Sequence, residues 1–281
     1  MSTDTSDAFR FGYEVWEAIA PTYERRRVDI EAVSATVSDW MLSELAPRAG
    51  DTLLELAAGP GDTGFEAATL VGERGRLIST DFSPTMLEAS RRRGAERGVS
   101  NVEYRVINAE RIELETDSVD GVLCRFGYML MADPAAALAQ TRRVLRPGGR
   151  LTLAVWGAPE RNPFFMIIAL SLVQRGHLPP PEPPPAPGLF AMASAARTTA
   201  LLEGAGFGEV HTEEVAVRFA LPDVDEYLSV VAASGPLGLA LQGLSDAERA
   251  EVKAEVEDSF PRFAAEHGYE IPGVALCAVA S

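Results

Sequence analysis

One apolar run that ends in a glycine-rich turn limits the fold of this chain more than any other feature. Residues 53–56 read Leu-Leu-Glu-Leu, and Gly59, Gly61 and Gly64 follow closely. A short apolar run of this kind is typical of a buried strand. Glycine lets the backbone turn tightly and approach a ligand without a Cβ in the way. The run therefore predicts a strand, a turn and a helix that together hold a nucleotide.

Carboxylates in and near this turn indicate which nucleotide fits. The glycine spacing matches the dinucleotide fingerprint, and Asp81 lies at a suitable distance downstream to hold ribose hydroxyls. A pyrophosphate, however, needs hydrogen-bond donors at the helix N-terminus, and it would meet the carboxylates of Glu55 and Asp62 there. These carboxylates favour a cation. S-adenosylmethionine (SAM) is a nucleoside with an ammonium and a sulfonium and no phosphate, so it suits the same turn.

Four blocks of sequence resemble, in order and spacing, the class I SAM-dependent methyltransferases. The resemblance is closest to the branch with quinone-biosynthesis and related small-molecule enzymes. It extends from about Trp16 to the C-terminus and is strongest over residues 52–156. Ala57 stands where the family usually has a first glycine, and Asn108 where it commonly has aspartate. The four blocks are Leu53–Gly61, Ser79–Leu87, Asn108–Glu110 and Arg143–Leu151.

The resemblance implies a Rossmann-like, doubly wound α/β fold. Its sheet has seven strands with the last strand antiparallel, and N-terminal helices and a helical lid insertion are added to it. The resemblance also implies SAM as cofactor, S-adenosylhomocysteine as product, and in-line transfer of a methyl group to a small, largely apolar acceptor. The cofactor-binding residues expected on these grounds are Glu55, Ala57, Gly59, Gly61, Asp81, Phe82, Met86, Asn108, Ala109, Glu110 and Arg125.

Several of these residues also have a structural explanation. Phe82 and Met86 suit an apolar core equally well, and Asp81 or Asn108 could cap a helix or turn. Arg125 is expected either to reach the methionine carboxylate of SAM or to pair with Glu110. A carboxylate inside an apolar strand, such as that of Glu55, needs a cationic or hydrogen-bonded partner, because an unpaired buried charge is costly.

The sequence does not point to one catalytic residue. Positioning and exclusion of water supply much of the acceleration when the methyl donor is already activated, so a general base is optional. The few candidates are His177, Tyr23 and Tyr128, together with His211 and His267 in the C-terminal part of the chain. A lone histidine in a helix or strand is more often structural than catalytic. No spacing of Asp, Asn, His or Cys residues suggests a metal site.

Composition and charge favour a small-molecule enzyme in the cytoplasm. The net charge of −16 would repel nucleic acids and anionic membrane surfaces. Met1–Phe11 lacks the apolar segment of a signal peptide, and the most apolar window, Phe164–Val173, is about half a membrane span. Cys124 and Cys277 lie in apolar runs, so they are expected to be buried free thiols. Free thiols are typical of proteins in a reducing compartment. No integral membrane segment is expected, and the oligomeric state is not predicted.

The alternation of apolar runs and breakers predicts four parts of the chain. These are an N-terminal helical cap (1–48), a SAM-binding core (49–156), a lid that binds the acceptor (157–200), and the C-terminal part of the sheet with helices (201–281). Strands are expected at 52–57, 76–81, 101–107, 119–124, 150–156, 210–219 and 273–280. After two helices within 13–46, helices are expected at 61–70, 84–97, 134–145, 163–174, 194–204, 223–233 and 245–266, with an extended proline run at 179–187.

Two other functions remain open. A nicotinamide-dependent oxidoreductase uses a similar sheet, but it would need a second βαβαβ half, for which the C-terminal pattern gives no support. A non-catalytic SAM-binding protein would share the cofactor residues and differ only in turnover.

Overall fold

The computed structural model describes residues 5–180, 182 and 186–281, and its sheet confirms the predicted architecture. The seven strands lie in the order β3-β2-β1-β4-β5-β7-β6. Strand β7 runs antiparallel to both of its neighbours, while β1 to β5 are parallel. The bounds are Thr52–Glu55 (β1), Arg76–Asp81 (β2), Val102–Val106 (β3), Val119–Arg125 (β4), Leu145–Trp156 (β5), Val210–Leu221 (β6) and Tyr269–Ala280 (β7).

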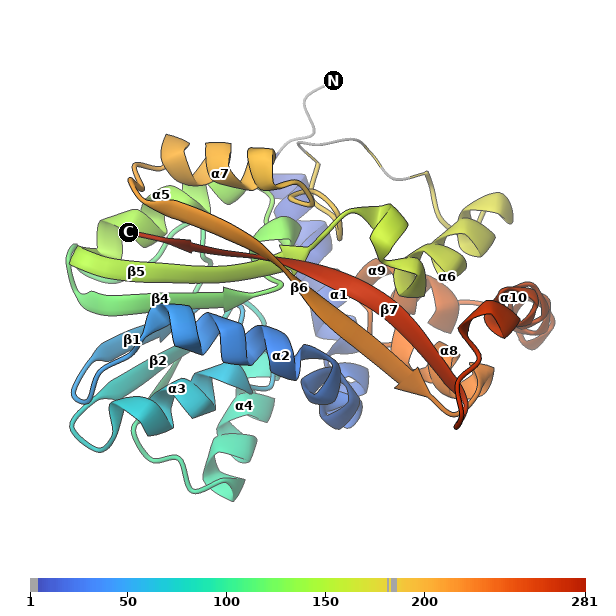
Figure 1. Cartoon of the computed structure of the whole chain (residues 1–281), viewed down its shortest axis with the longest axis horizontal. Coiled ribbons are helices and arrows are strands. Elements are labelled where there is room, and N and C mark those ends of the chain that lie inside the picture. Colours follow the sequence, from blue (N-terminus) through green and yellow to red (C-terminus); the bar gives the residue numbers. More distant parts are fainter. Residues whose placement is uncertain (1–4, 181, 183–185) are drawn as a thin grey trace.

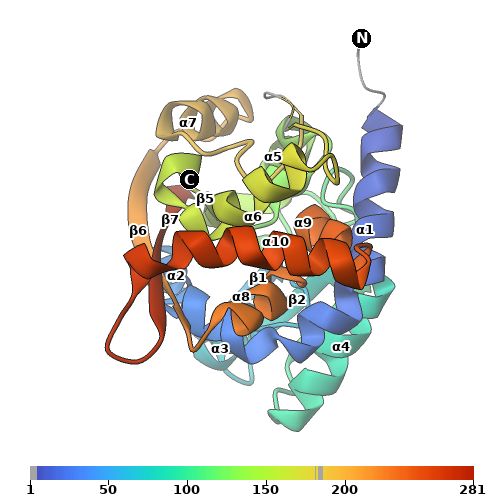
Figure 2. The ribbon, with the colours of Figure 1, turned by 90° about the vertical axis from the view of Figure 1, so that its right-hand side faces the viewer.

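Helices cover both faces of the sheet and one of its ends. Figure 1 shows α2 and α3 on one face and α5 and α7 on the other. Helices α6, α8, α9 and α10 gather beyond the end at which the parallel strands terminate, and Figure 2 looks onto this helical layer with α10 in front. The bounds are Thr5–Arg25 (α1), Arg27–Leu45 (α2), Thr63–Val71 (α3), Pro84–Glu96 (α4), Pro134–Val144 (α5), Pro163–Gln174 (α6), Ala195–Gly204 (α7), Val224–Val231 (α8), Gly235–Gln242 (α9) and Asp246–Ser259 (α10).

Local capping signals fix the helix starts near the carboxyl end of the sheet. The Ser83 side chain accepts a hydrogen bond from the Met86 N–H at 3.0 Å, and Asp133 accepts one from the Ala136 N–H at 2.9 Å. Each cap is followed by a proline in the first turn, where its missing N–H is not needed. Because Ser83 caps α4, the carboxylate of Asp81 does not serve as the helix cap.

Helix α9 was not predicted from the sequence. It contains Gly235, Pro236 and Gly238, which are poor helix formers. Tertiary packing explains why it forms: a Cβ on Gly238 would lie 2.4 Å from the carbonyl oxygen of Ala232, so only glycine allows this close approach to the end of α8.

Other element limits also differ from those predicted. Helix α1 is already formed at Thr5, β7 begins at Tyr269, and α10 ends at Ser259, where a 3₁₀ turn containing Pro261 follows. Part of the expected extended proline run, residues 181 and 183–185, lies outside the described residues. None of the helices in the described ranges is both long and apolar enough to cross a bilayer.

Candidate functional site

A cavity lies at the carboxyl ends of β1, β2 and β4, where the order of the parallel strands reverses. Ligand sites in open α/β sheets occur at such a switch point. Helices α1, α2 and α6 and strand β6 complete its walls. The sequence-predicted site residues on these walls are Ala57, Gly59, Asp81, Phe82, Met86, Asn108, Ala109, Glu110 and Arg125.

The turn after β1 and the end of β2 meet at Asp81. One carboxylate oxygen of Asp81 accepts the N–H of Gly59 and the other accepts the N–H of Ser83, both at 2.9 Å. Gly59 has a φ of 55°, in the left-handed region that glycine adopts without strain. Burial raises the pKa of Asp81 to about 6. The carboxylate is thus fixed at the cavity wall with lone pairs free for a further donor.

Glu55 and Gly61 lie beneath the turn and do not line the cavity. Glu55 accepts the N–H of Gly64 at 2.9 Å and the hydroxyl of Ser79 at 3.2 Å, which confirms the expected hydrogen-bonded partner. Burial raises its pKa to about 7. A Cβ on Gly64 would fall 2.0 Å from the Glu55 carboxylate, and one on Gly61 would fall 2.5 Å from the Phe65 ring. Packing under the turn therefore requires these two glycines.

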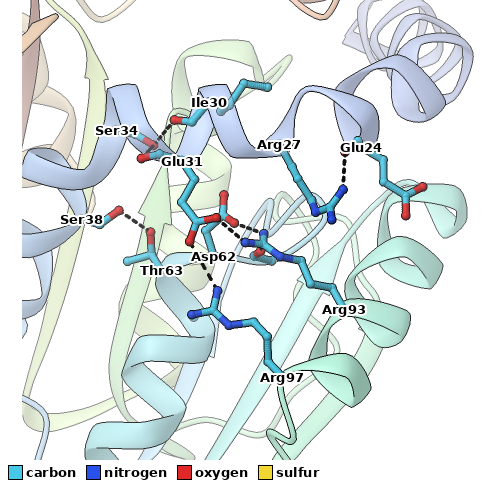
Figure 3. A network of polar contacts seen from close by, with 12 residues as sticks. Glu24, Arg27, Ile30, Glu31, Ser34, Ser38, Asp62, Thr63, Arg93 and Arg97 are labelled. Atoms are coloured by element: carbon cyan, nitrogen blue, oxygen red, sulfur yellow. Dashed lines mark hydrogen bonds and ion pairs between the residues drawn. The ribbon is translucent and has the colours of Figure 1, made fainter.

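The charge of Asp62 is neutralised by the protein itself. Its carboxylate is buried and pairs with Arg93 from α4 and with Arg125 at the end of β4. Arg93 also pairs with Glu31 from α2. Figure 3 shows the guanidiniums of Arg93 and Arg97 directed toward Glu31. This network joins α2, the glycine turn and α4, so the cations that Asp62 meets are arginines.

Arg125 is held from two sides. It donates to Asp62 at 2.8 Å and to the hydroxyls of Ser34 and Ser38 on α2. It does not pair with Glu110, so that alternative is wrong. The Glu110 carboxylate accepts instead the backbone N–H groups of Ala132 and Asp133, at 2.9 and 3.1 Å.

Of the tyrosines considered for catalysis, Tyr23 lies at the cavity and Tyr128 does not. The Tyr23 ring lies 3.8 Å from the position of a Cβ built on Gly59. Burial raises the pKa of its phenol to about 12, so the phenol stays protonated at neutral pH. Tyr128 is fully buried in the core, where its hydroxyl lies 2.6 Å from that of Thr141.

The three histidines lie away from the cavity wall. His177 follows α6, and its backbone N–H donates to the carbonyl of Leu172. His211 is exposed on β6, and His267 is exposed before β7. Across the described ranges, no three His, Cys, Asp or Glu side chains gather in a way that could hold a metal ion.

Aromatic side chains form the other end of the cavity. The Phe126 and Trp156 rings stack with centroids 4.2 Å apart, and those of Phe164 and Phe219 stack at 3.8 Å. Phe126 has a φ of 59°, an unusual backbone conformation for a bulky residue. The predicted acceptor-binding segment 157–200 includes Phe164 and Phe165, but the sequence analysis did not identify Phe126, Trp156 and Phe219 as site residues. Two of these could have been found, because Phe126 directly follows β4 and Trp156 ends β5 at the carboxyl edge.

A family model and several known proteins match this chain. The model of the ubiE/COQ5 methyltransferase family matches residues 14–169. A ubiquinone/menaquinone biosynthesis C-methyltransferase UbiE from Marinomonas sp. is 37% identical over 120 residues, which are 42% of this chain and 48% of that protein. The protein of the same name from Shewanella halifaxensis is 28% identical over 177 residues, 58% of this chain and 70% of that protein. The chain thus spans about half the length of the Marinomonas relative.

Solved structures share the fold. The YcgJ protein from Bacillus subtilis has a TM-score of 0.56 and 20% identity, with 86% of this chain and 96% of that chain covered. A SAM dependent methyltransferase from Aquifex aeolicus has a TM-score of 0.53 and 21% identity, with 70% and 92% covered.

Proposed function

Because the chain belongs to the ubiE/COQ5 methyltransferase family, we propose that it transfers a methyl group from SAM to a small, largely apolar acceptor. One observation carries this proposal: a single cavity has the glycine turn and Asp81 at one end and an aromatic wall at the other. In-line transfer needs the donor and the acceptor side by side in a space from which water is excluded. A continuous cavity meets this requirement.

The nucleoside part of SAM fits the end of the cavity near β2. Asp81 would accept the ribose hydroxyls, since each of its oxygens has one backbone partner and a further lone pair. Gly59 would allow the ligand to approach the backbone, because the nearest atom to a Cβ there is 3.8 Å away. Phe82 and Met86 would pack against the adenine, and Asn108 would offer its amide.

Arg125 would bind the methionine carboxylate. Asp62, Ser34 and Ser38 hold its guanidinium in place. A fixed guanidinium binds a carboxylate with charge-assisted hydrogen bonds, which are among the strongest in proteins. Glu55 then has a supporting role, because its partners lie under the turn.

The chain's part in the reaction would be to orient and enclose the reactants. SAM, when bound, supplies a methyl group on a sulfonium that is already activated toward nucleophiles. Tyr23 covers the glycine turn from α1, and its protonated phenol would act as a hydrogen-bond donor and not as a base. The aromatic wall would hold the acceptor and exclude water.

The segment 157–200 would contribute to acceptor binding through Phe164, Phe165 and Leu189, which line the cavity. The net charge of −16 supports a small-molecule acceptor over a nucleic acid. A ring precursor of ubiquinone or menaquinone, as the relatives' names suggest, is one acceptor to test. The buried free thiols of Cys124 and Cys277 support a reducing cytoplasmic location.

Ligand titration followed by a transfer assay tests the proposal. Purified protein is titrated with SAM, S-adenosylhomocysteine and NADH, and is then incubated with methyl-labelled SAM and a metabolite extract, whose labelled products are identified by mass spectrometry. We expect binding of the first two ligands and transfer of the label. Binding of NADH alone would favour an oxidoreductase, and SAM binding with no labelled product from any extract would favour a non-catalytic SAM-binding protein.

A further inference from the structure

Two segments of the chain cap the N-terminus of α4. Ser83, which directly precedes the helix, accepts the Met86 N–H at 3.0 Å. The second segment is α1, whose Glu17 accepts the Thr85 N–H at 3.2 Å and the Thr85 hydroxyl at 2.7 Å. The first helical residue, Pro84, has no N–H to satisfy. Glu17 therefore completes, from another helix, a cap that is usually made by residues next to the helix itself.

The Glu17 carboxylate also contacts Ser83, the residue that holds Asp81. The Ser83 hydroxyl donates to Glu17, while the Ser83 backbone N–H donates to Asp81 at 2.9 Å. Because the hydroxyl proton is directed to Glu17, the lone pairs of the Ser83 oxygen are left for Met86. Glu17 and Asp81 are thus connected through one residue. The charge of Glu17 adds to burial in raising the pKa of Asp81.

Glu17 binds these groups as an anion. Burial disfavours its charged form, but the hydrogen bonds from Ser83 and Thr85 hold the pKa of Glu17 below its usual value of 4.5. The carboxylate also lies at the positive end of the α4 dipole, which stabilises a negative charge. Hydrogen bonds to a charged acceptor are stronger than those between neutral groups, so this cap holds α1 firmly at the start of α4.

The position of α1 also determines one wall of the cavity. The residues of α1 that line the cavity are Ala8, Phe9, Gly12, Trp16 and Tyr23. The ring centroid of Phe9 lies 5.9 Å from that of Phe82, which follows Asp81 and lines the same cavity. Helix α1 and the turn after β2 therefore face one part of the cavity, and the Glu17 cap joins them.

We infer that Glu17 is a positioning residue for the cofactor: from α1, it fixes the turn that carries Asp81, so that the Asp81 carboxylate meets the ribose hydroxyls in one orientation. This inference rests on the proposed function, which assigns the ribose to Asp81. Glu17 does not line the cavity and acts through Ser83. Without the cap, the turn and α1 would have to be ordered when the ligand binds, and this cost lowers the affinity.

A pair of nucleosides tests this role by calorimetry. Adenosine and 2′,3′-dideoxyadenosine differ only in the two ribose hydroxyls that Asp81 would accept. The wild type is expected to prefer adenosine about tenfold or more. In Glu17→Ala this preference should fall to about threefold or less, and the affinity for S-adenosylhomocysteine should fall about three- to tenfold. A purely structural role of Glu17 would lower stability but leave the preference of the folded protein unchanged.

Glu24→Ala is the matched control. Glu24 also lies on α1 and pairs with Arg92 of α4 at 2.7 Å, but it does not line the cavity. Its replacement removes a contact between the same two helices and should leave the preference for adenosine intact. Thr85→Val is a second, milder test variant. It keeps the shape of the side chain but removes the hydroxyl that Glu17 accepts, so it should lower the preference in the same direction.

Two outcomes would overturn the inference, with the folding of each variant checked by circular dichroism. The first is a wild-type preference for adenosine in folded Glu17→Ala or, should that variant not fold, in Thr85→Val. The second is an equal loss of the preference in Glu24→Ala, which would indicate a general loosening of α1. Equal binding of the two nucleosides by the wild type would instead contradict the proposed function, because the ribose would not contact Asp81. The wild-type titration thus distinguishes the two failures.

Discussion

Asp62 and Arg125 form an ion pair of 2.8 Å that joins the turn after β1 to the end of β4. Both side chains are nearly buried, with 5% and 11% exposed. The sequence suggested that the Asp62 carboxylate would meet a cationic ligand, but the structure shows that it fixes an arginine. The end of the cavity near the turn therefore presents a positioned guanidinium, which favours an anionic group on the ligand.

Arg125→Gln tests whether this guanidinium binds the methionine carboxylate. We expect the affinity for S-adenosylhomocysteine to fall about ten- to a hundredfold, since a hydrogen bond to a charged group contributes about 1.5–3 kcal/mol. The affinity for 5′-methylthioadenosine, which has no carboxylate, should stay within about twofold. Calorimetric titration of both ligands measures the difference.

Arg146→Gln is the control for this variant. Arg146 pairs with Asp120 at the opposite end of the sheet, away from the cavity. The Arg146→Gln variant should bind S-adenosylhomocysteine and 5′-methylthioadenosine as the wild type does. If Arg125→Gln weakens both ligands equally, the guanidinium has no specific contact with the carboxylate.

Asp62→Asn should destabilise the fold. The substitution keeps the shape of the side chain but leaves Arg93 and Arg125 without their shared buried carboxylate. Breaking a buried ion pair costs about 3 kcal/mol or more, so the free energy of unfolding in urea, measured without ligand, should fall by about that amount. Glu88→Gln, which breaks an exposed pair with Arg91, should change it by less than about 1 kcal/mol. A similar small change in Asp62→Asn would contradict the role assigned to the network.

Glu55 should make stability depend on pH. Burial raises its pKa from 4.5 to about 7, so between these values the folded protein holds a proton that the unfolded chain has released. The free energy of unfolding therefore falls as pH rises through this window. Between pH 5 and 7.5 the wild type should lose about 2–3 kcal/mol relative to Glu55→Gln. Urea unfolding at both pH values checks this, with Glu88→Gln as a control that keeps the wild-type dependence. Identical pH dependence in Glu55→Gln and the wild type would show that this carboxyl does not titrate in the window.

The sheet could be predicted because its signals are local. Strands β1, β4 and β5 each contain a short apolar run, and the helices near the site begin at caps such as Ser83 and Asp133 that the sequence displays. Helix α9 could not be found in this way, because Gly235 and Gly238 disfavour a helix and tertiary packing, chiefly against α1 and α6, compensates.

The site was predictable where it follows the strands and not where distant segments meet. Gly59 and Asp81 follow from the end of β1 and the end of β2. The partners of Asp62, by contrast, come from α4 and β4, and no periodicity in the sequence links them. The aromatic wall likewise combines Trp156 of β5 with Phe219 of β6, a pairing that depends on how the antiparallel end of the sheet is folded.

Titration of S-adenosylhomocysteine into the wild type, Asp81→Asn and Asp120→Asn tests the central claim most directly. Asp81 lies at the cavity, whereas Asp120 accepts the Thr52 N–H at 2.8 Å near the amino end of the sheet. If the cavity binds SAM through the ribose, affinity should fall about ten- to a hundredfold in Asp81→Asn and remain unchanged in Asp120→Asn, with both variants folded. Unchanged affinity in a folded Asp81→Asn, or no binding by the wild type, would contradict the account.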